Sequence, residues 1–275
     1  MAYFCSAVLL LSAAVHGVVF LVDGGSWAGP LSWRKPIGFG LSFGISLATI
    51  AWLMGFLRPH RLTGWVLLVI LSVASVGEVF LVAMQTWRGV PSHFNESTAF
   101  DESVFSMMGM LVSVIVLVTA VVTVRSFFRI DAPPSLALAI RAGLVLMLVS
   151  QAVGVAMIVV GGNTFGAAGA MKVPHAFTLH AVQVLPALAL LLLVADTAER
   201  HRLRLVAVGA IGYTALIAST MLQTFTGRQL FDLGLTASAA ALVGLGLLVA
   251  SGLLALREAV RAASSGVAAG GPGPA

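Results

Sequence analysis

The residues best suited to chemistry are three ionisable side chains inside otherwise apolar segments. His16, Glu78 and His180 each interrupt a run of hydrophobic residues. An ionisable side chain is expensive in such a segment, and it usually faces a protein interior or a wet cavity. Glu78 buried singly would be neutral, whereas a histidine partner would let it ionise. These three residues are therefore the first candidates for a functional site.

The composition around these residues excludes a soluble enzyme. Of the 275 residues, 59% are hydrophobic and only 9% are charged, whereas a soluble protein carries about 25% charged residues. The net charge is +5, but no basic run is dense enough to bind nucleic acid. The single Cys5 excludes an intramolecular disulfide or a Cys-x-x-Cys pair. We therefore predict a polytopic membrane protein whose main partner is the lipid bilayer.

Eight apolar segments are long enough to cross a bilayer, whose hydrocarbon core of about 30 Å needs roughly 20 apolar residues per helix. Because backbone groups in lipid must be satisfied internally, we expect an all-α bundle of about eight transmembrane helices. Pro186 is expected to kink the sixth helix. The bundle should occupy residues 1–261, and the Ala-, Gly-, Ser- and Pro-rich residues 262–275 should form a disordered tail. The predicted helices span about residues 3–22, 37–57, 64–84, 104–124, 135–160, 175–195, 205–225 and 236–256.

The basic residues predict the orientation of this bundle. One set of loops carries nine Lys and Arg residues and the other set carries five. The positive-inside rule places the richer side in the cytoplasm, and both termini with it. Thirteen arginines against two lysines, with abundant Ala and Gly, are typical of a GC-rich bacterial genome. The predicted location is therefore the inner membrane of a bacterium.

Helical depth groups the ionisable residues in one layer. At a rise of 1.5 Å per residue, His16, Glu78 and His180 lie about 9–10 Å below the outer ends of their helices. Gln183 lies beside His180 on the same helix, and Glu78 and Gln85 share a face. His16 could equally bond a neighbouring backbone carbonyl. His93 is expected at the membrane surface, where it caps or positions its loop.

Imidazole and carboxylate groups in one layer are suitable ligands for a transition metal. His175 and His180 lie about 140° apart around a helix, so they do not chelate like an i, i+4 pair. Alternatively, His16 and His180 are axial ligands of a haem, with Gln183 and Arg88 also in contact with the cofactor. Glu78 is the candidate catalytic group. The predicted metal ligands are His16, Glu78, His175 and His180.

Three of the outer segments resemble a family of uncharacterised bacterial integral membrane proteins. The resemblance extends over the first six helices and implies a polytopic membrane fold. No established activity is associated with that family, so the resemblance implies no mechanism. The matching stretches are Trp33-Arg34-Lys35-Pro36, Gln85 with Arg88-Gly89 and Ser92-His93-Phe94-Asn95, and His175 through His180 with Gln183.

Three functions agree with these patterns. The first is a metal or haem protein that performs redox or hydrolytic chemistry in the outer half of the bundle. The second is a proton-coupled transporter of a small anionic solute, in which Glu78 and His180 exchange protons while Arg88 and Lys172 attract the anion. The third is a non-catalytic component that binds a lipid or a partner. We prefer the first because it explains the shared depth most directly, and because no inverted repeat supports a transporter.

Overall fold

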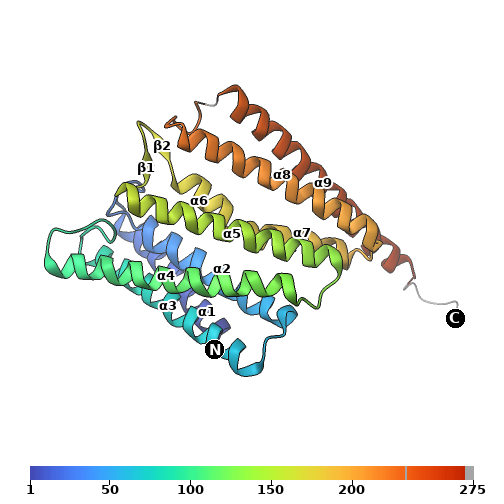
Figure 1. The fold of residues 1–275 in the computed structure, drawn as a ribbon, viewed down its shortest axis with the longest axis horizontal. Helices are drawn as coiled ribbons and strands as arrows, with labels where there is room; N and C mark the ends of the chain where they lie inside the picture. The colour runs from blue at the N-terminus through green and yellow to red at the C-terminus, as the bar shows by residue number, and fades with distance from the viewer. Residues whose placement is uncertain (233, 270–275) are drawn as a thin grey trace. The chain divides into compact units, whose positions relative to one another are not determined.

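The computed structural model describes residues 1–232 and 234–269, with side chains up to residue 264. In this part of the chain every long element is a helix, and the only sheet is a two-stranded hairpin (Figure 1). Eight helical segments of the described residues are long and apolar enough to cross a membrane. The all-α class and the eight predicted spans are therefore confirmed.

The chain divides into two compact units rather than one continuous bundle. Unit 1 is Met1–Arg129 and unit 2 is Ile130–Ala275. The division falls just before Pro133 and Pro134. Proline has a fixed φ and no N–H group, so the helix before this pair cannot continue through it. The single domain expected over residues 1–261 is thus made of two units, which are described separately.

Unit 1 is an up-and-down arrangement of four helices. α2 packs against α1 and α3, and α3 packs against α4. α1 and α3 end, and α2 and α4 begin, at the same end of the unit. We call this the predicted outer end, because the charge count places it outside. The helices are α1 (Ala2–Asp23), α2 (Arg34–Leu57), α3 (Arg61–Trp87) and α4 (Ala99–Phe128).

Small residues bring α1 and α2 into close contact. A Cβ atom added at Gly40 would lie 2.8 Å from the Leu9 carbonyl oxygen and 2.9 Å from the Ala13 Cβ. One turn further along α2, the Gly44 carbonyl accepts a hydrogen bond of 2.7 Å from the Ser6 hydroxyl. Small residues allow helix backbones to approach in membranes, where packing replaces the hydrophobic effect as the driving force. This contact holds the first half of α2 against the first half of α1.

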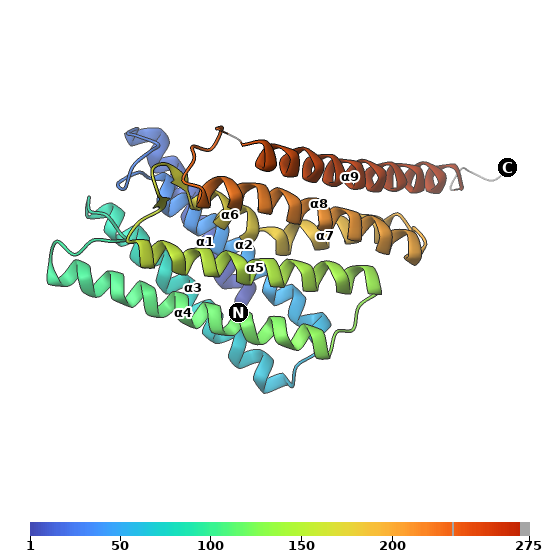
Figure 2. The same ribbon diagram turned by 45° about the horizontal axis from the view of Figure 1, so that its top comes forward.

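Unit 2 contains five helices and the hairpin among the described residues. α8 and α9 lie side by side along their length in Figures 1 and 2. α9 continues past residue 261 and so enters the segment predicted as a tail, whereas residues 270–275 lie outside the described part. The elements are α5 (Pro134–Val160), β1 (Thr164–Phe165), β2 (Gly169–Ala170), α6 (Lys172–Leu179), α7 (Ala181–Val194), α8 (Glu199–Phe225) and α9 (Leu235–Ala269).

The sixth span is interrupted at His180, which lies between α6 and α7. Pro186, where a kink was expected, lies inside α7. In a continuous helix the Phe177 carbonyl would bond to the amide four residues later. Here it accepts a 2.6 Å hydrogen bond from the Tyr213 hydroxyl of α8. A side chain from another helix therefore satisfies a backbone group at the interruption.

Candidate functional site

Glu78, near the predicted outer end of α3, is the most unusual buried residue of unit 1. It is fully buried, with 0% of its surface exposed. Neither carboxyl oxygen has a hydrogen-bond partner among the described residues. Burying a polar group without hydrogen bonds costs free energy, and burying a charge without them costs more. A carboxyl group in this position therefore needs a functional or structural explanation.

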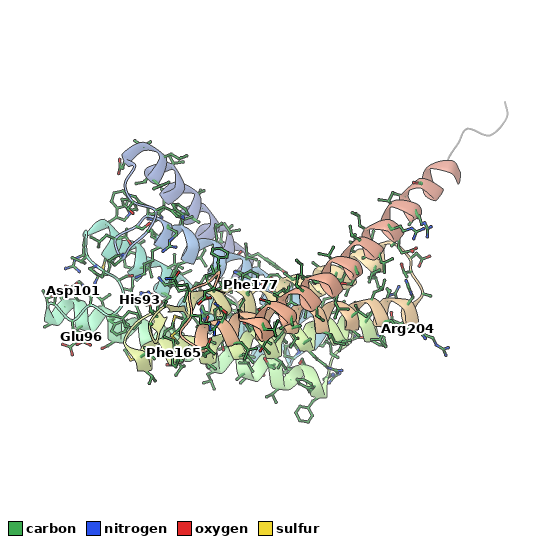
Figure 3. The ribbon with its side chains drawn as sticks, turned by 90° about the horizontal axis from the view of Figure 1, so that it is seen from above. His93, Glu96, Asp101, Phe165, Phe177 and Arg204 are labelled. Atoms are coloured by element: carbon green, nitrogen blue, oxygen red, sulfur yellow. The ribbon has the colours of Figure 1, made fainter. Side chains whose placement is uncertain are left out.

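His93 is the nearest basic side chain recorded at Glu78. Its Nε2 atom lies 3.8 Å from Glu78 Oε1, and its side chain is 24% exposed. The other ring nitrogen, Nδ1, lies 3.1 Å from the Ser92 hydroxyl. Figure 3 labels His93, which belongs to the loop between α3 and α4. The expected role of His93, to cap or position this loop, left out this contact, because the loop brings the imidazole to a buried carboxyl group.

Aromatic rings from α2 and α4 surround the His93 imidazole. The ring centroid of His93 lies 5.4 Å from that of Phe39 and 6.2 Å from that of Phe105. Phe94, the next residue in the loop, has a left-handed φ of 56°, which is uncommon for a residue with a side chain. Its ring lies 5.3 Å from Phe105. Packing on two helices therefore holds the loop in a sharp turn that directs His93 inward.

Lys35 adds a positive charge to this region. It lies in the first turn of α2 and is half-buried, and its charge favours the ionised form of the Glu78 carboxyl. A helix N-terminus is itself positive because its first amide groups have no partners within the helix. The contact that the geometry shows at Glu78 is the one with the His93 imidazole. We call Glu78 and His93, with Lys35 at the start of α2, the proton site.

A second polar cluster lies two helical turns further along α3, at Gln85, which is on the same face of the helix as Glu78. Gln85 donates from Nε2 to Asp101 Oδ1 at 2.9 Å, and Arg88 donates to the same oxygen at 2.6 Å. Arg88 also bonds Gln85 Oε1 and lies 4.6 Å from the Phe100 ring centroid. Arg88 was expected to contact a cofactor, but its guanidinium group is used to balance a buried aspartate. This cluster joins the end of α3 to the start of α4.

Asp101 is the anchor of this cluster and is labelled in Figure 3. Its Oδ2 atom accepts a 2.7 Å hydrogen bond from the Thr98 hydroxyl. In return, the Thr98 hydroxyl accepts a 3.1 Å hydrogen bond from the Asp101 amide, which caps α4. A threonine at this position satisfies one of the amides left over at a helix start. The cap fixes the end of the loop that carries His93.

His16 makes hydrogen bonds with both of its ring nitrogens. The Trp87 indole donates to His16 Nε2 at 3.1 Å, although the two residues are 71 positions apart. Because an indole only donates, Nε2 accepts, and Nδ1 must carry the proton that bonds the Ser12 carbonyl at 2.7 Å. The Trp33 and Trp87 rings pack edge to face with centroids 4.9 Å apart. This arrangement leaves neither nitrogen of His16 to ligate haem or a metal unless a bond breaks.

The remaining predicted residues lie in unit 2. Nδ1 of His175 lies 2.8 Å from the Ser150 carbonyl oxygen, and the Ser150 hydroxyl donates to the His175 carbonyl at 2.7 Å. Nδ1 of His180 lies 3.3 Å from Gln183 Oε1. The expected pairing of His180 with Gln183 is therefore confirmed. His180 is also the residue at which the sixth span is interrupted.

The predicted metal or haem site is not assembled within either unit. His16 and Glu78 belong to unit 1, whereas His175 and His180 belong to unit 2. Inside each unit, no three His, Cys, Asp or Glu side chains of the described residues are close enough to hold a metal ion. With His16 bonded at both nitrogens, the contacts do not fit the ligand set predicted from the sequence.

The fold defines an integral membrane protein with eight apolar helical spans among its described residues. Comparison with protein-family models, curated proteins and solved structures gave no match. The resemblance to a bacterial membrane-protein family therefore stays a prediction. Function has to be inferred from the side chains themselves.

Sequence reasoning missed His93 and Lys35 as partners of Glu78. Depth along a helix follows from counting residues, so Glu78 could be found. His93 lies in an irregular loop, where no period indicates the direction of a side chain. The only available signal was its place in the Ser92-His93-Phe94-Asn95 stretch, between two helices that pack together.

Proposed function

We propose that the chain is a proton-coupled membrane transport protein in which Glu78 and His93 exchange a proton. The observation that carries this proposal is the fully buried Glu78 carboxyl, with His93 Nε2 3.8 Å away. The metal or haem interpretation has less support, because the contacts do not assemble its ligands within a unit. In the sequence analysis the proton was exchanged between Glu78 and His180. In this proposal Glu78 keeps that role, and His93 takes the place of His180.

The distance between the His93 imidazole and the Glu78 carboxyl suits the transfer of a proton better than a permanent ion pair. Proton transfer needs donor and acceptor at about 2.6–3.2 Å, and such contacts are often longer before a substrate binds. A shift of less than about 1 Å would bring the His93 and Glu78 atoms into that range. Histidine changes its charge between about pH 5 and 8, so it can pass a proton under physiological conditions.

His93 also provides a route for the proton. One ring nitrogen faces the Glu78 carboxyl and the other lies beside the Ser92 hydroxyl. An imidazole can accept a proton at one nitrogen and release one from the other. Its partial exposure supports access from outside unit 1. Protons would thus reach Glu78 through His93 from the predicted outer end.

The proposed setting is the inner membrane of a bacterium, with both termini in the cytoplasm. The unequal number of basic residues in alternate loops supports this orientation. The loop that carries His93 would then face outward, where protons are taken up. Counting along α3, which ends at Trp87, puts the Glu78 carboxyl about 13 Å below the outer end of this helix.

Infrared difference spectroscopy tests the proton site directly. Full-length protein in lipid is cycled between about pH 5 and 8, and the carbonyl stretch of a protonated, buried carboxyl group is followed. We expect this band in the parent protein, its loss in Glu78→Gln, and its retention in Glu102→Gln, a matched change at an exposed glutamate of α4. His93→Gln should move the midpoint of the transition.

A band that persists unchanged in Glu78→Gln would assign it to another carboxyl and refute the proton site. Transport is measured separately in proteoliposomes that enclose a pH-sensitive dye. A small anion added outside should acidify the interior of parent vesicles but not of Glu78→Gln vesicles. Equal acidification in both would remove Glu78 from the coupling.

A further inference from the structure

The predicted inner end of unit 1 carries a concentrated positive charge. Four arginines lie there, in the turn between α2 and α3 and at the end of α4: Arg58, Arg61, Arg125 and Arg129. The acidic residues of the same unit all lie nearer its opposite end: Asp23, Glu78, Glu96, Asp101 and Glu102. Within residues 1–129, all of which the structure describes, no carboxylate therefore balances the arginines at this end.

Arg125 joins the end of α4 to the end of α2. Its Nε atom donates to the Leu57 carbonyl at 3.2 Å, and its Nη2 atom donates to the Arg58 carbonyl at 2.9 Å. The last carbonyls of a helix have no partners within it, so a cation is stabilised there. The guanidinium group is thus fixed in place. Its Nη1 atom makes no hydrogen bond within the described residues and can donate to a ligand.

The turn between α2 and α3 is held firmly against α3. Arg58 has a left-handed φ of 40°, and a Cβ atom added at Gly64 would lie 2.8 Å from Pro59 Cγ. The turn is therefore packed on the first turn of the next helix. Arg61 follows Arg58 by three residues, which span at most about 11 Å. The backbone of Arg61 accordingly lies near the carbonyl to which Arg125 is bonded.

Arg61 and Arg129 have exposed side chains. Neither side chain has a hydrogen bond or an ion pair among the described residues. The Arg129 amide donates to the Arg125 carbonyl at 2.9 Å, which keeps its backbone one turn from Arg125. Two available guanidinium groups therefore lie on either side, in the chain, of elements that Arg125 holds together.

Large apolar side chains are exposed beside these arginines. Trp65, one helical turn after Arg61, is 60% exposed, and Phe128, next to Arg129, is 85% exposed. Aromatic rings beside cations are typical of the boundary between lipid and water. A small soluble anion gains nothing from such rings, whereas a phospholipid has both a phosphate group and acyl chains.

We infer that the predicted inner end of unit 1 is a binding surface for an anionic phospholipid. Arg61, Arg125 and Arg129 hold its phosphate group, to which a guanidinium can donate two parallel hydrogen bonds. Trp65 and Phe128 contact its acyl chains. The headgroup supplies the negative charge that unit 1 lacks at this end, and anionic lipids are a component of the cytoplasmic leaflet. This surface is independent of the proton site, which lies toward the other end of the unit.

Titration of the full-length protein in a neutral detergent tests this inference, with bound lipid counted by native mass spectrometry. The probe is dioleoyl phosphatidylglycerol, and dioleoyl phosphatidylcholine is the reference with the same acyl chains and no net charge. At about a factor of five per arginine, Arg61 and Arg129 together should give the parent protein an about 25-fold preference for phosphatidylglycerol. Added salt should reduce the preference. Equal affinity for the two lipids would overturn the inference.

Single substitutions locate the surface. Arg61→Gln and Arg129→Gln remove no hydrogen bond of the fold, so both variants should fold, and each should bind phosphatidylglycerol about fivefold more weakly. Arg34→Gln is the matched control, because Arg34 is an exposed arginine at the opposite end of unit 1, and it should bind like the parent. An equal loss in Arg34→Gln would indicate attraction to net charge alone and overturn the inference. Soluble glycerol phosphate that binds as tightly as the lipid would show a site for free phosphate instead.

Discussion

Replacing Glu78 with methionine should stabilise the protein while it abolishes function. The Glu78 carboxyl is fully buried, and its oxygens have no hydrogen-bond partner in the described part of the chain. Methionine has a similar length and no polar atom that requires a partner. Natural proteins accept such costs at functional sites, where stability is exchanged for activity.

The expected gain follows from the cost of an unsatisfied group. A buried polar group without a partner costs about 1–3 kcal/mol. A volume-conserving exchange into a packed region costs less than about 1.5 kcal/mol, so the net change should stabilise the fold by about 1 kcal/mol. Lys35 is only half-buried, so its ammonium group can remain hydrated when the carboxylate is lost.

The assay is thermal unfolding of the purified protein in one detergent, followed by tryptophan fluorescence. A gain of about 1 kcal/mol raises Tm by roughly 2–4 °C in a protein of this size range. Gln85→Met is the matched control. Gln85 is also fully buried on the same face of α3, but it donates to Asp101, so its replacement should lower Tm.

The decisive result is that Glu78→Met raises Tm whereas Gln85→Met lowers it. If Glu78→Met lowers Tm as much as Gln85→Met does, Glu78 makes a stabilising interaction in the folded protein. The proton site would then be a structural ion pair, and the reasoning from its unpaired oxygens would be refuted.

Two further substitutions test the packing within the units. Gly40→Val should reduce the yield of folded protein, because its Cβ would lie within 3 Å of the Leu9 carbonyl and the Ala13 Cβ; folded yield by size-exclusion chromatography equal to that of the parent would contradict the close contact. Tyr213→Phe should destabilise unit 2 by about 0.5–1.5 kcal/mol, because it removes the hydrogen bond to the Phe177 carbonyl. Proteolysis near the interruption of the sixth span should then become faster, and an unchanged rate would show that this bond is dispensable.

Much of the fold could be predicted because lipid imposes simple requirements. Segments of about 20 apolar residues must be helical in a bilayer, and all eight predicted spans correspond to helical segments. The shared face of Glu78 and Gln85 also follows from the helical period alone. The contact of His180 with Gln183 needed only their separation of three residues in the sequence.

The contacts of the candidate site that join different helices could not be predicted from spacing along one helix. The depth of His16, about 10 Å below the end of its helix, follows from counting residues, but its bond to Trp87 depends on packing between α1 and α3. The same holds for Arg88, whose partner Asp101 begins the next helix. The interruption at His180 was not expected, because a kink was predicted only at Pro186, the proline within this span.

The sequence by itself determined that this protein is a helical membrane protein and that Glu78 lies within the outer part of one of its spans. Length, hydropathy and the helical rise are enough for both conclusions, since each depends on neighbours along the chain. Only the tertiary structure decided that His93 and Lys35 are the groups near Glu78, and that His16 is already bonded at both nitrogens. These contacts join residues far apart in sequence through loop conformation and helix packing, which no local period encodes.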